Sequence, residues 1–199
     1  MTRSEQKRLA IINAAKEEFI QYGFIAANMD RVSLNAEVSK RTLYRHFESK
    51  EVLFESVLAI IQSSVDETID YPFSLDVSLY EQLKAISNKE VDILYHTYGI
   101  PLTRVILIEF LRHPEMAHAI IAKIYNGKAL RNWFADAMAS GQLKIMPLDL
   151  LTNTYLSLFN GMFLWPQVFE LQPIPSDKER EDKIEHLVSV VLAACAPTV

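Results

Sequence analysis

The sequence has little of what stabilises secreted or membrane proteins. It contains one cysteine, Cys195, so no disulfide can close within the chain and no group of thiolates can hold structural zinc. No apolar run approaches the roughly 18 residues that a bilayer span needs, and the polar first residues lack the apolar segment of a secretory signal. We therefore expect a cytoplasmic protein without a membrane segment.

Motifs of common enzymes are missing as well. The sequence has no Gly-x-Ser-x-Gly nucleophile elbow, no Walker loop and no His-Glu-x-x-His zinc motif. A Glu-x-x-His spacing occurs at Glu115 and His118, with His113 nearby, but di-iron carboxylate bundles need two copies of it. Surface residues after Pro114 explain the single copy equally well. We expect no metal, no cofactor and no catalytic residue.

Glycines and strand signals are scarce too. Only five glycines occur among 199 residues, and no sustained alternation of apolar and polar side chains is visible. Apolar residues instead recur at helical spacing, and half of the residues are hydrophobic, which is enough to build ordinary cores. The sequence therefore predicts an all-α protein. The expected helices cover residues 4–22, 29–36, 40–47, 50–70, 77–96, 101–112, 115–125, 128–140, 148–170 and 177–195.

Local signals place the ends of the first four helices. Gly23 is suited to end the first helix, and Asn28, Ser39 and Ser49 are suited to cap the next three. The charge changes at about the same place. Residues 1–50 carry nine basic and six acidic side chains, a net charge of +3, whereas the remaining 149 carry eleven and nineteen, a net charge of −8.

Together these patterns predict two domains without a Gly/Ser linker. Residues 1–50 are expected to form a basic domain of three helices with a helix-turn-helix, and residues 51–199 a larger, acidic helical domain; we expect DNA binding by the first, and effector binding and dimerisation by the second, from the residues and the resemblance given below. The boundary falls near the start of the fourth helix, so we expect a rigid connection. A basic segment on an acidic body is typical of a small nucleic-acid reader, although an ordinary solvated surface would look similar.

The third helix carries the sharpest chemical signal. On a helical wheel with Leu43 at 0°, Phe47 lies at about 40°, and these two residues define the buried side. Arg41 and Arg45 fall at about 160° and 200°, on the opposite side. Two outward guanidinium groups need a partner from outside the helix. Arginine can bind guanine through two parallel hydrogen bonds in the major groove, and threonine, tyrosine and lysine can contact bases or phosphates. The alternative is a solvated basic face. The candidate DNA-binding residues are Lys40, Arg41, Thr42, Tyr44, Arg45, His46 and Lys50.

The same residues carry a family resemblance. The stretches 28–32, 36–47 and 49–54, with Ile11, Ala15, Phe19 and Gly23 before them, resemble the signature of the TetR family of bacterial transcriptional regulators. The resemblance covers roughly residues 5–57. It implies that the run from Thr42 to Phe47 belongs to the recognition helix. By this resemblance Thr42, Tyr44, His46 and Lys50 contact DNA, whereas Leu43 and Phe47 belong to the core.

Two positions depart from the family pattern. Many members have glycine where this chain has Glu37, in the turn between the two helices, and also where it has Arg41. A residue with a Cβ at position 37 must either adopt a positive φ or change the turn, at a cost of roughly 1 kcal/mol. Arg41 instead adds a candidate for base reading.

The acidic part shows an amphipathic last helix and an apolar helix before it. Ile184, Leu187, Val188, Val191 and Leu192 follow helical spacing. In the preceding helix we expect two apolar sides, which favours packing on its own core and on a second chain through segments 148–170 and 177–195. Burial of both sides within a monomer is the alternative. One side is expected to hold Leu151, Tyr155, Leu158, Met162 and Trp165, and the other Phe159, Phe163 and Phe169.

Such a homodimer would read a palindromic operator of double-stranded DNA. The resemblance also implies an effector cavity in the acidic part, where aromatic side chains would suit a flat, apolar or cationic small molecule, although core packing explains most aromatics. A helical dimer that binds a protein partner is a further alternative, and a metal-dependent helical-bundle enzyme another. The candidate effector residues are Tyr95, Glu109, Phe110, Trp133, Phe159 and Phe163.

Overall fold

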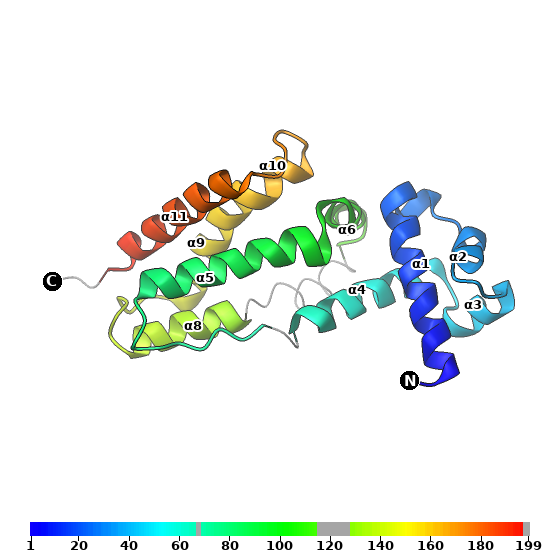
Figure 1. The fold of residues 1–199 in the computed structure, drawn as a ribbon, viewed down its shortest axis with the longest axis horizontal. Helices are drawn as coiled ribbons and strands as arrows, with labels where there is room; N and C mark the ends of the chain where they lie inside the picture. The colour runs from blue at the N-terminus through cyan, green and yellow to red at the C-terminus, as the bar shows by residue number, and fades with distance from the viewer. Residues whose placement is uncertain (67–68, 115–127, 197–199) are drawn as a thin grey trace. The chain divides into compact units, whose positions relative to one another are not determined.

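The computed structural model describes residues 1–66, 69–114 and 128–196, and every regular element in these ranges is helical. The all-α prediction is therefore confirmed for this part of the chain. The described residues form two compact units, the first with residues 1–66 and 101–114 and the second with residues 69–100 and 128–196 (Figure 1). The expected helix over residues 115–125 lies outside the described residues.

The first unit contains the predicted helix-turn-helix. Its helices are α1 (Arg3–Ala26), α2 (Met29–Asn35), α3 (Lys40–His46), α4 (Lys50–Asp66) and nearly all of α6 (Ile100–Arg112). Side chains from the first four helices meet in one core, in which the Phe19 ring lies edge-on to Phe54 at 5.1 Å. Burying each large apolar side chain stabilises the fold by about 1.5–3 kcal/mol. The core includes Ile11, Ala15, Phe19, Val32, Leu43, Phe47, Leu53 and Phe54.

The capping predictions are confirmed. The Asn28 side chain accepts from the Asp30 amide at 2.7 Å, Ser39 Oγ from the Thr42 amide at 3.2 Å, and Ser49 Oγ from the Val52 amide at 3.3 Å. Each bond satisfies an amide that has no partner within its own helix. These caps fix where α2, α3 and α4 begin.

Two predicted ends differ from the structure. Gly23 does interrupt the first helix, with φ 73° and ψ 167°, but a short helical stretch follows it and α1 runs on to Ala26. Glycine is suited to this break because a positive φ is strained for residues with a Cβ. The fourth helix was predicted to reach Asp70, but neither residue 69 nor residue 70 is helical.

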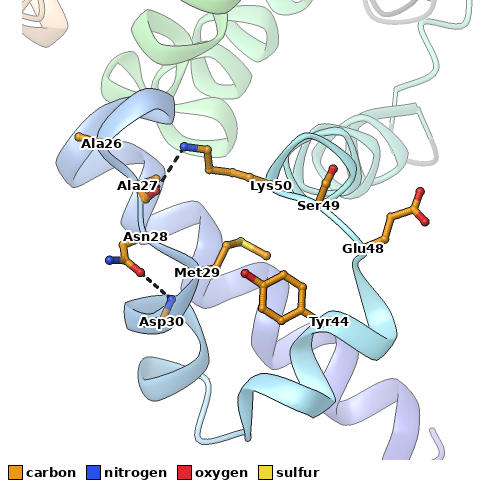
Figure 2. Close-up of a pocket in the computed structure, with 9 residues that line it drawn as sticks. All are labelled: Ala26, Ala27, Asn28, Met29, Asp30, Tyr44, Glu48, Ser49 and Lys50. Carbon is orange, nitrogen blue, oxygen red and sulfur yellow. Dashed lines mark hydrogen bonds between the residues drawn. The ribbon is translucent and has the colours of Figure 1, made fainter.

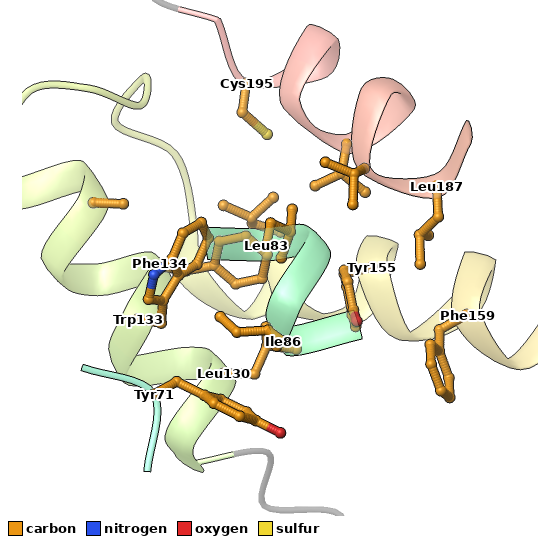
Figure 3. Close-up of a cluster of buried hydrophobic side chains, with 14 of the residues drawn as sticks. Tyr71, Leu83, Ile86, Leu130, Trp133, Phe134, Tyr155, Phe159, Leu187 and Cys195 are labelled. Carbon is orange, nitrogen blue, oxygen red and sulfur yellow. The ribbon is translucent and has the colours of Figure 1, made fainter. Parts of the chain in front are cut away.

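The second unit is a helical body around one aromatic-rich core (Figure 3). It contains α5 (Leu79–Asp92), α8 (Lys128–Ala139), α9 (Leu148–Phe159), the short α10 (Trp165–Val168) and α11 (Asp177–Ala194). Two π-helical segments interrupt the predicted long helices: η1 (Ile93–Tyr98) follows α5, and η2 (Asn160–Leu164) lies between α9 and α10. The angle between successive side chains around the helix axis is therefore smaller in the π-helical segments than in the α-helices on either side.

This change of rotation corrects one prediction. Tyr155, Phe159 and Phe163 were assigned to two sides, but all three are buried in the same core, with successive ring centroids 6.0 and 5.2 Å apart. Trp165 and Phe169 are exposed instead, and their rings stack at 6.0 Å. Tyr155 and Phe159 are four residues apart within α9 and so differ by only about 40° around the helix, and the wider π turn of η2 keeps Phe163 on the same side.

Candidate DNA-binding surface

The turn between α2 and α3 has the geometry of a left-handed helix end. The Val38 amide donates to the Ser33 carbonyl and the Glu37 amide to the Leu34 carbonyl, both at 3.0 Å, and Glu37 has φ 54°. This pair of bonds is the Schellman arrangement, whose left-handed residue is usually glycine. The expectation that Glu37 takes a positive φ or changes the turn is thus resolved: Glu37 takes the positive φ and keeps the tight turn.

The recognition helix α3 presents its charged side to solvent. Leu43 and Phe47 are 0% and 1% exposed, which anchors one side of the helix in the core. Arg41, Tyr44 and Arg45 are exposed on the other side, as the wheel predicts. Two buried side chains therefore hold the helix in place, and Arg41, Tyr44 and Arg45 face solvent.

The cations on α3 have different surroundings. Arg41 and Arg45 make no ion pair or hydrogen bond with any residue that the structure describes. The Lys40 ammonium lies 2.6 Å from the Asp30 carboxylate, and both side chains are more than half exposed. An exposed pair of this kind contributes at most about 1 kcal/mol, so a phosphate can replace the carboxylate.

Thr42 and His46 lie at the edge of this exposed side. The hydroxyls of Ser39 and Thr42 are 2.9 Å apart and share a hydrogen bond. His46 is half-buried, and its Nε2 atom has no hydrogen-bond partner among the described residues. Burial lowers the pKa of His46, and the charges of Arg45, Arg8 and Lys7 lower it further. His46 is therefore neutral at pH 7.

Lys50 is engaged within the protein. Its ammonium donates to the carbonyls of Ile25 at 2.9 Å and Ala27 at 3.3 Å, and it lies 4.8 Å from the centre of the Phe24 ring. These contacts tie the start of α4 to the end of α1. The sequence predicted a phosphate contact for Lys50, but it gave no sign of this structural role.

A surface cavity of about 520 Å³ lies beside Lys50 (Figure 2). Its wall combines the start of α2, the start of α4 and the exposed Tyr44 of α3. Amides at the start of α4, together with a lysine and a tyrosine hydroxyl, are groups that suit a phosphate oxygen. The lining residues are Ala26, Ala27, Asn28, Met29, Asp30, Tyr44, Glu48, Ser49 and Lys50.

Sequence reasoning missed a buried acid that orders this surface. Glu18 is 2% exposed and accepts hydrogen bonds from the Arg31 side chain and from the Asn28 amide. Its signal was available, because Glu18 lies seven residues after Ile11 on the apolar stripe of α1, where an acid is unusual. Its partner, thirteen residues away, had no comparable signal.

The candidate effector residues do not form one group in the structure. Glu109 and Phe110 belong to α6 in the first unit, and the buried Glu109 carboxylate lies 3.2 Å from the Arg112 guanidinium. Tyr95 and Trp133 belong to the second unit. The Trp133 indole donates to Gln82 Oε1 at 3.1 Å within the core. Because buried aromatics also serve as core, an effector role for these residues stays a prediction.

Tyr95 joins the two π-helical segments of the second unit. Its hydroxyl, on η1, donates to the Phe163 carbonyl of η2 at 2.9 Å. Burial raises the pKa of Tyr95 to about 12, so the hydroxyl stays protonated and remains a donor. Phe163 is fully buried, and Phe159 is 6% exposed. Three of the predicted residues are thus brought together here by η1, α9 and η2.

Neither a cluster of metal ligands nor a membrane-spanning helix occurs among the described residues. They contain no group of three or more His, Cys, Asp or Glu side chains that could hold a metal ion. The Glu115 and His118 pair lies outside the described residues, while His113 is described and lies near the Glu109 carboxylate. No helix in the described ranges is long and apolar enough to cross a membrane.

Comparison with known proteins agrees with this architecture. The family profile described as bacterial regulatory proteins of the tetR family matches residues 11–57. The profile described as the C-terminal domain of AefR-like transcriptional repressors matches residues 81–197, more than half of the chain. The chain belongs to the TetR family of bacterial transcriptional regulators.

The similarity to individual relatives extends over most or all of the chain. The structure of a TetR-family regulator from Pseudomonas syringae pv. tomato is 28% identical in sequence and has a TM-score of 0.83. The match covers 100% of both chains. The flavonoid-responsive regulator FrrA is also 28% identical, with a TM-score of 0.78 over 98% of this chain and 100% of its own. The uncharacterized regulator YhgD of Bacillus subtilis is 27% identical over 88% of this chain and 90% of its own.

Proposed function

We propose that this chain is a cytoplasmic repressor that binds a palindromic operator as a homodimer and is released by a small-molecule effector. The observation that carries the proposal is the pair Arg41 and Arg45, which are exposed and unpaired among the described residues, opposite the buried Leu43 and Phe47. Arginine on a helix that enters the major groove can bind guanine O6 and N7 together. We assign base reading to these two residues and to Thr42.

The remaining candidates are assigned to the DNA backbone. Tyr44 is exposed at the cavity beside α4, and Lys40 can exchange the Asp30 carboxylate for a phosphate. Lys50 lies on the same cavity, where its charge attracts a phosphate while its hydrogen bonds hold α1. His46 contributes as a neutral side chain at the edge of the surface. Phosphate contacts of this kind set the register of α3 on the duplex.

Dimerisation is proposed through segments 148–170 and 177–195. Both segments expose apolar side chains, which a second chain would cover in a two-fold arrangement. Two copies of α3, spaced about 34–36 Å or a multiple of this apart, would then read the two halves of a palindrome. The exposed apolar residues of these segments are Leu150, Trp165, Phe169 and Val190.

The effector is proposed to be a flat aromatic compound bound in the helical body beyond the boundary near residue 50. Tyr95, Trp133, Phe159 and Phe163 are aromatic side chains of the second unit, and the similarity to the flavonoid-responsive regulator FrrA supports the same class of compound. Glu109 and Phe110 belong to α6 in the first unit and are left out of this site. The effector would act by binding more tightly to a dimer with one spacing of its two DNA-binding domains than to a dimer with another. We propose no catalytic activity.

Selection of bound duplexes from a random pool tests the proposal. The expected product is a palindrome that binds with a steep loss of affinity as salt rises, because phosphate contacts release counterions. Light scattering of the free protein should give the mass of a dimer. Enrichment of no sequence, with a flat salt response, would overturn the proposal and favour a helical dimer that binds a protein partner.

A further inference from the structure

The start of α1 carries three cations, Arg3, Lys7 and Arg8, two of which lie near α3. Arg3 and Arg8 are exposed, and Lys7 is half-buried. The Arg8 guanidinium lies over the Phe47 ring at 5.3 Å, which places this end of α1 at the C-terminal end of α3. Figure 1 shows the N-terminus and α3 on the same part of the first unit.

The surroundings of His46 support the same arrangement. The cations that act on its ring are Arg45 of α3 and Arg8 and Lys7 of α1, so the basic groups of the two helices share one neighbourhood. Arg45 on α3 and Lys7 and Arg8 on α1 therefore belong to one basic surface of the first unit. Arg3 lies one helical turn before Lys7 on the same side of α1.

The neighbouring acid Glu5 does not form an ion pair with Arg3 or Lys7 among the described residues. Glu5, which lies between Arg3 and Lys7 in the sequence, accepts from the Thr2 amide at 2.6 Å and completes a capping box. Neither Arg3 nor Lys7 makes an ion pair or hydrogen bond with a described residue. Their positive charge at a helix N-terminus also opposes the helix dipole, so these cations do not stabilise α1. A role outside the protein explains why such a cluster is tolerated.

We propose that the start of α1 is a second DNA contact, in which Arg3 and Lys7 bind phosphates that flank the bases read by α3. The inference rests on the proposed DNA binding and adds a contact outside the helix-turn-helix. Arg3 and Lys7 are four residues apart and therefore lie along one side of α1, which suits successive phosphates of one strand. Because phosphates carry no base identity, these residues should add affinity without changing sequence preference.

A matched pair of variants tests this contact. The double variant Arg3→Gln with Lys7→Gln removes the two charges and keeps side-chain length. Lys16→Gln is the control, because Lys16 is on the same helix nine residues from Lys7 and so projects about 180° away from it. Binding to the selected operator is measured from roughly 0.05 to 0.2 M salt, together with ethylation interference of individual phosphates.

The double variant is expected to bind about 100-fold more weakly near 0.1 M salt, with a larger loss at lower salt. The slope of log K against log salt concentration should be smaller in magnitude by about 1.8 for each chain on the DNA. Ethylation interference should disappear at the phosphates outside the bases that α3 reads. Lys16→Gln should retain the slope and the interference pattern of the natural chain. Thermal unfolding should show that both variants are folded.

Several outcomes would overturn the inference. If the double variant and Lys16→Gln have equal salt slopes and equal interference patterns, the start of α1 does not contact the backbone. If the double variant selects a different sequence, Arg3 or Lys7 reads bases instead. If the natural chain selects no operator at all, the proposed DNA binding has failed, and the contact proposed for α1 fails with it; this result is distinct from the first two because it appears before any variant is compared.

Discussion

Glu18 of α1 and Arg31 of α2 form an ion pair in which the carboxylate is almost fully buried and the guanidinium is partly exposed. Arg31 donates to Glu18 Oε1 through Nε at 2.9 Å and through Nη2 at 2.5 Å, and its guanidinium also lies 4.2 Å from the centre of the Tyr22 ring. The same carboxylate oxygen accepts from the Asn28 amide at 2.8 Å. One buried acid thus fixes the position of α2 against α1, and with it the turn that carries α3.

Glu18→Gln should lower the free energy of unfolding by about 2–3 kcal/mol, because the neutral amide loses the charge-assisted hydrogen bonds while the site stays buried. Urea denaturation followed by circular dichroism measures the loss. Glu17→Gln, at the exposed neighbouring position, is the matched control and should change stability by less than about 0.5 kcal/mol. Equal effects of the two variants would show that the ion pair does not order the unit.

Arg41→Ala and Arg45→Ala should each weaken operator binding by about 1–3 kcal/mol and relax preference at one base position of each half-site. Both side chains are exposed, so folding should be unaffected. Repeating the selection from a random pool with each variant identifies the position. If Arg41→Ala binds more weakly but selects the same sequence, Arg41 contacts a phosphate and not a base.

Lys50→Met should weaken both folding and DNA binding. The variant keeps the apolar part of the side chain near Phe24 but loses the hydrogen bonds to the carbonyls of Ile25 and Ala27. Since a hydrogen bond from a charged group contributes about 1.5–3 kcal/mol, a loss of about 2 kcal/mol in unfolding free energy is expected. Affinity should fall alike for all sequences. Unchanged stability would assign Lys50 to the DNA backbone alone.

The sequence predicted the local features of the site and missed the contacts between helices. Leu43, Arg41 and Arg45 could be placed because all three lie on one short helix, whose geometry is known in advance. Lys50 binds carbonyls that lie more than twenty residues earlier in the chain, and no periodic pattern reports such a contact. The predicted side of Phe163 was wrong, because the spacing of apolar residues does not reveal the π turn in which Phe163 lies.

Glu37→Gly should stabilise the protein by about 0.5–1 kcal/mol at most. Glu37 has φ 54°, a conformation that costs a residue with a Cβ roughly 1 kcal/mol, and part of the gain is offset by the greater freedom of glycine in the unfolded chain. Glu37→Ala is the control, since it removes the charge and keeps the strain. Chemical denaturation compares the three proteins. A stability for Glu37→Ala equal to that of Glu37→Gly would attribute the gain to charge.

Glu90→Gln should change the pH dependence of stability. Burial raises the pKa of Glu90, although a hydrogen bond from the Tyr71 hydroxyl at 2.7 Å acts in the opposite direction. A carboxyl whose pKa is higher in the folded state binds more protons when folded, so its contribution to stability falls as the pH rises above the ordinary value near 4.5.

The glutamine amide oxygen can still accept from Tyr71 and never ionises. Above pH 6 the variant should therefore be more stable than the natural chain, by an amount on the order of 1 kcal/mol, and at pH 4 this advantage should vanish. Thermal unfolding of both proteins across this range measures the difference, and a variant that is less stable at pH 7 would mean that the charged carboxylate is the favoured partner of Tyr71.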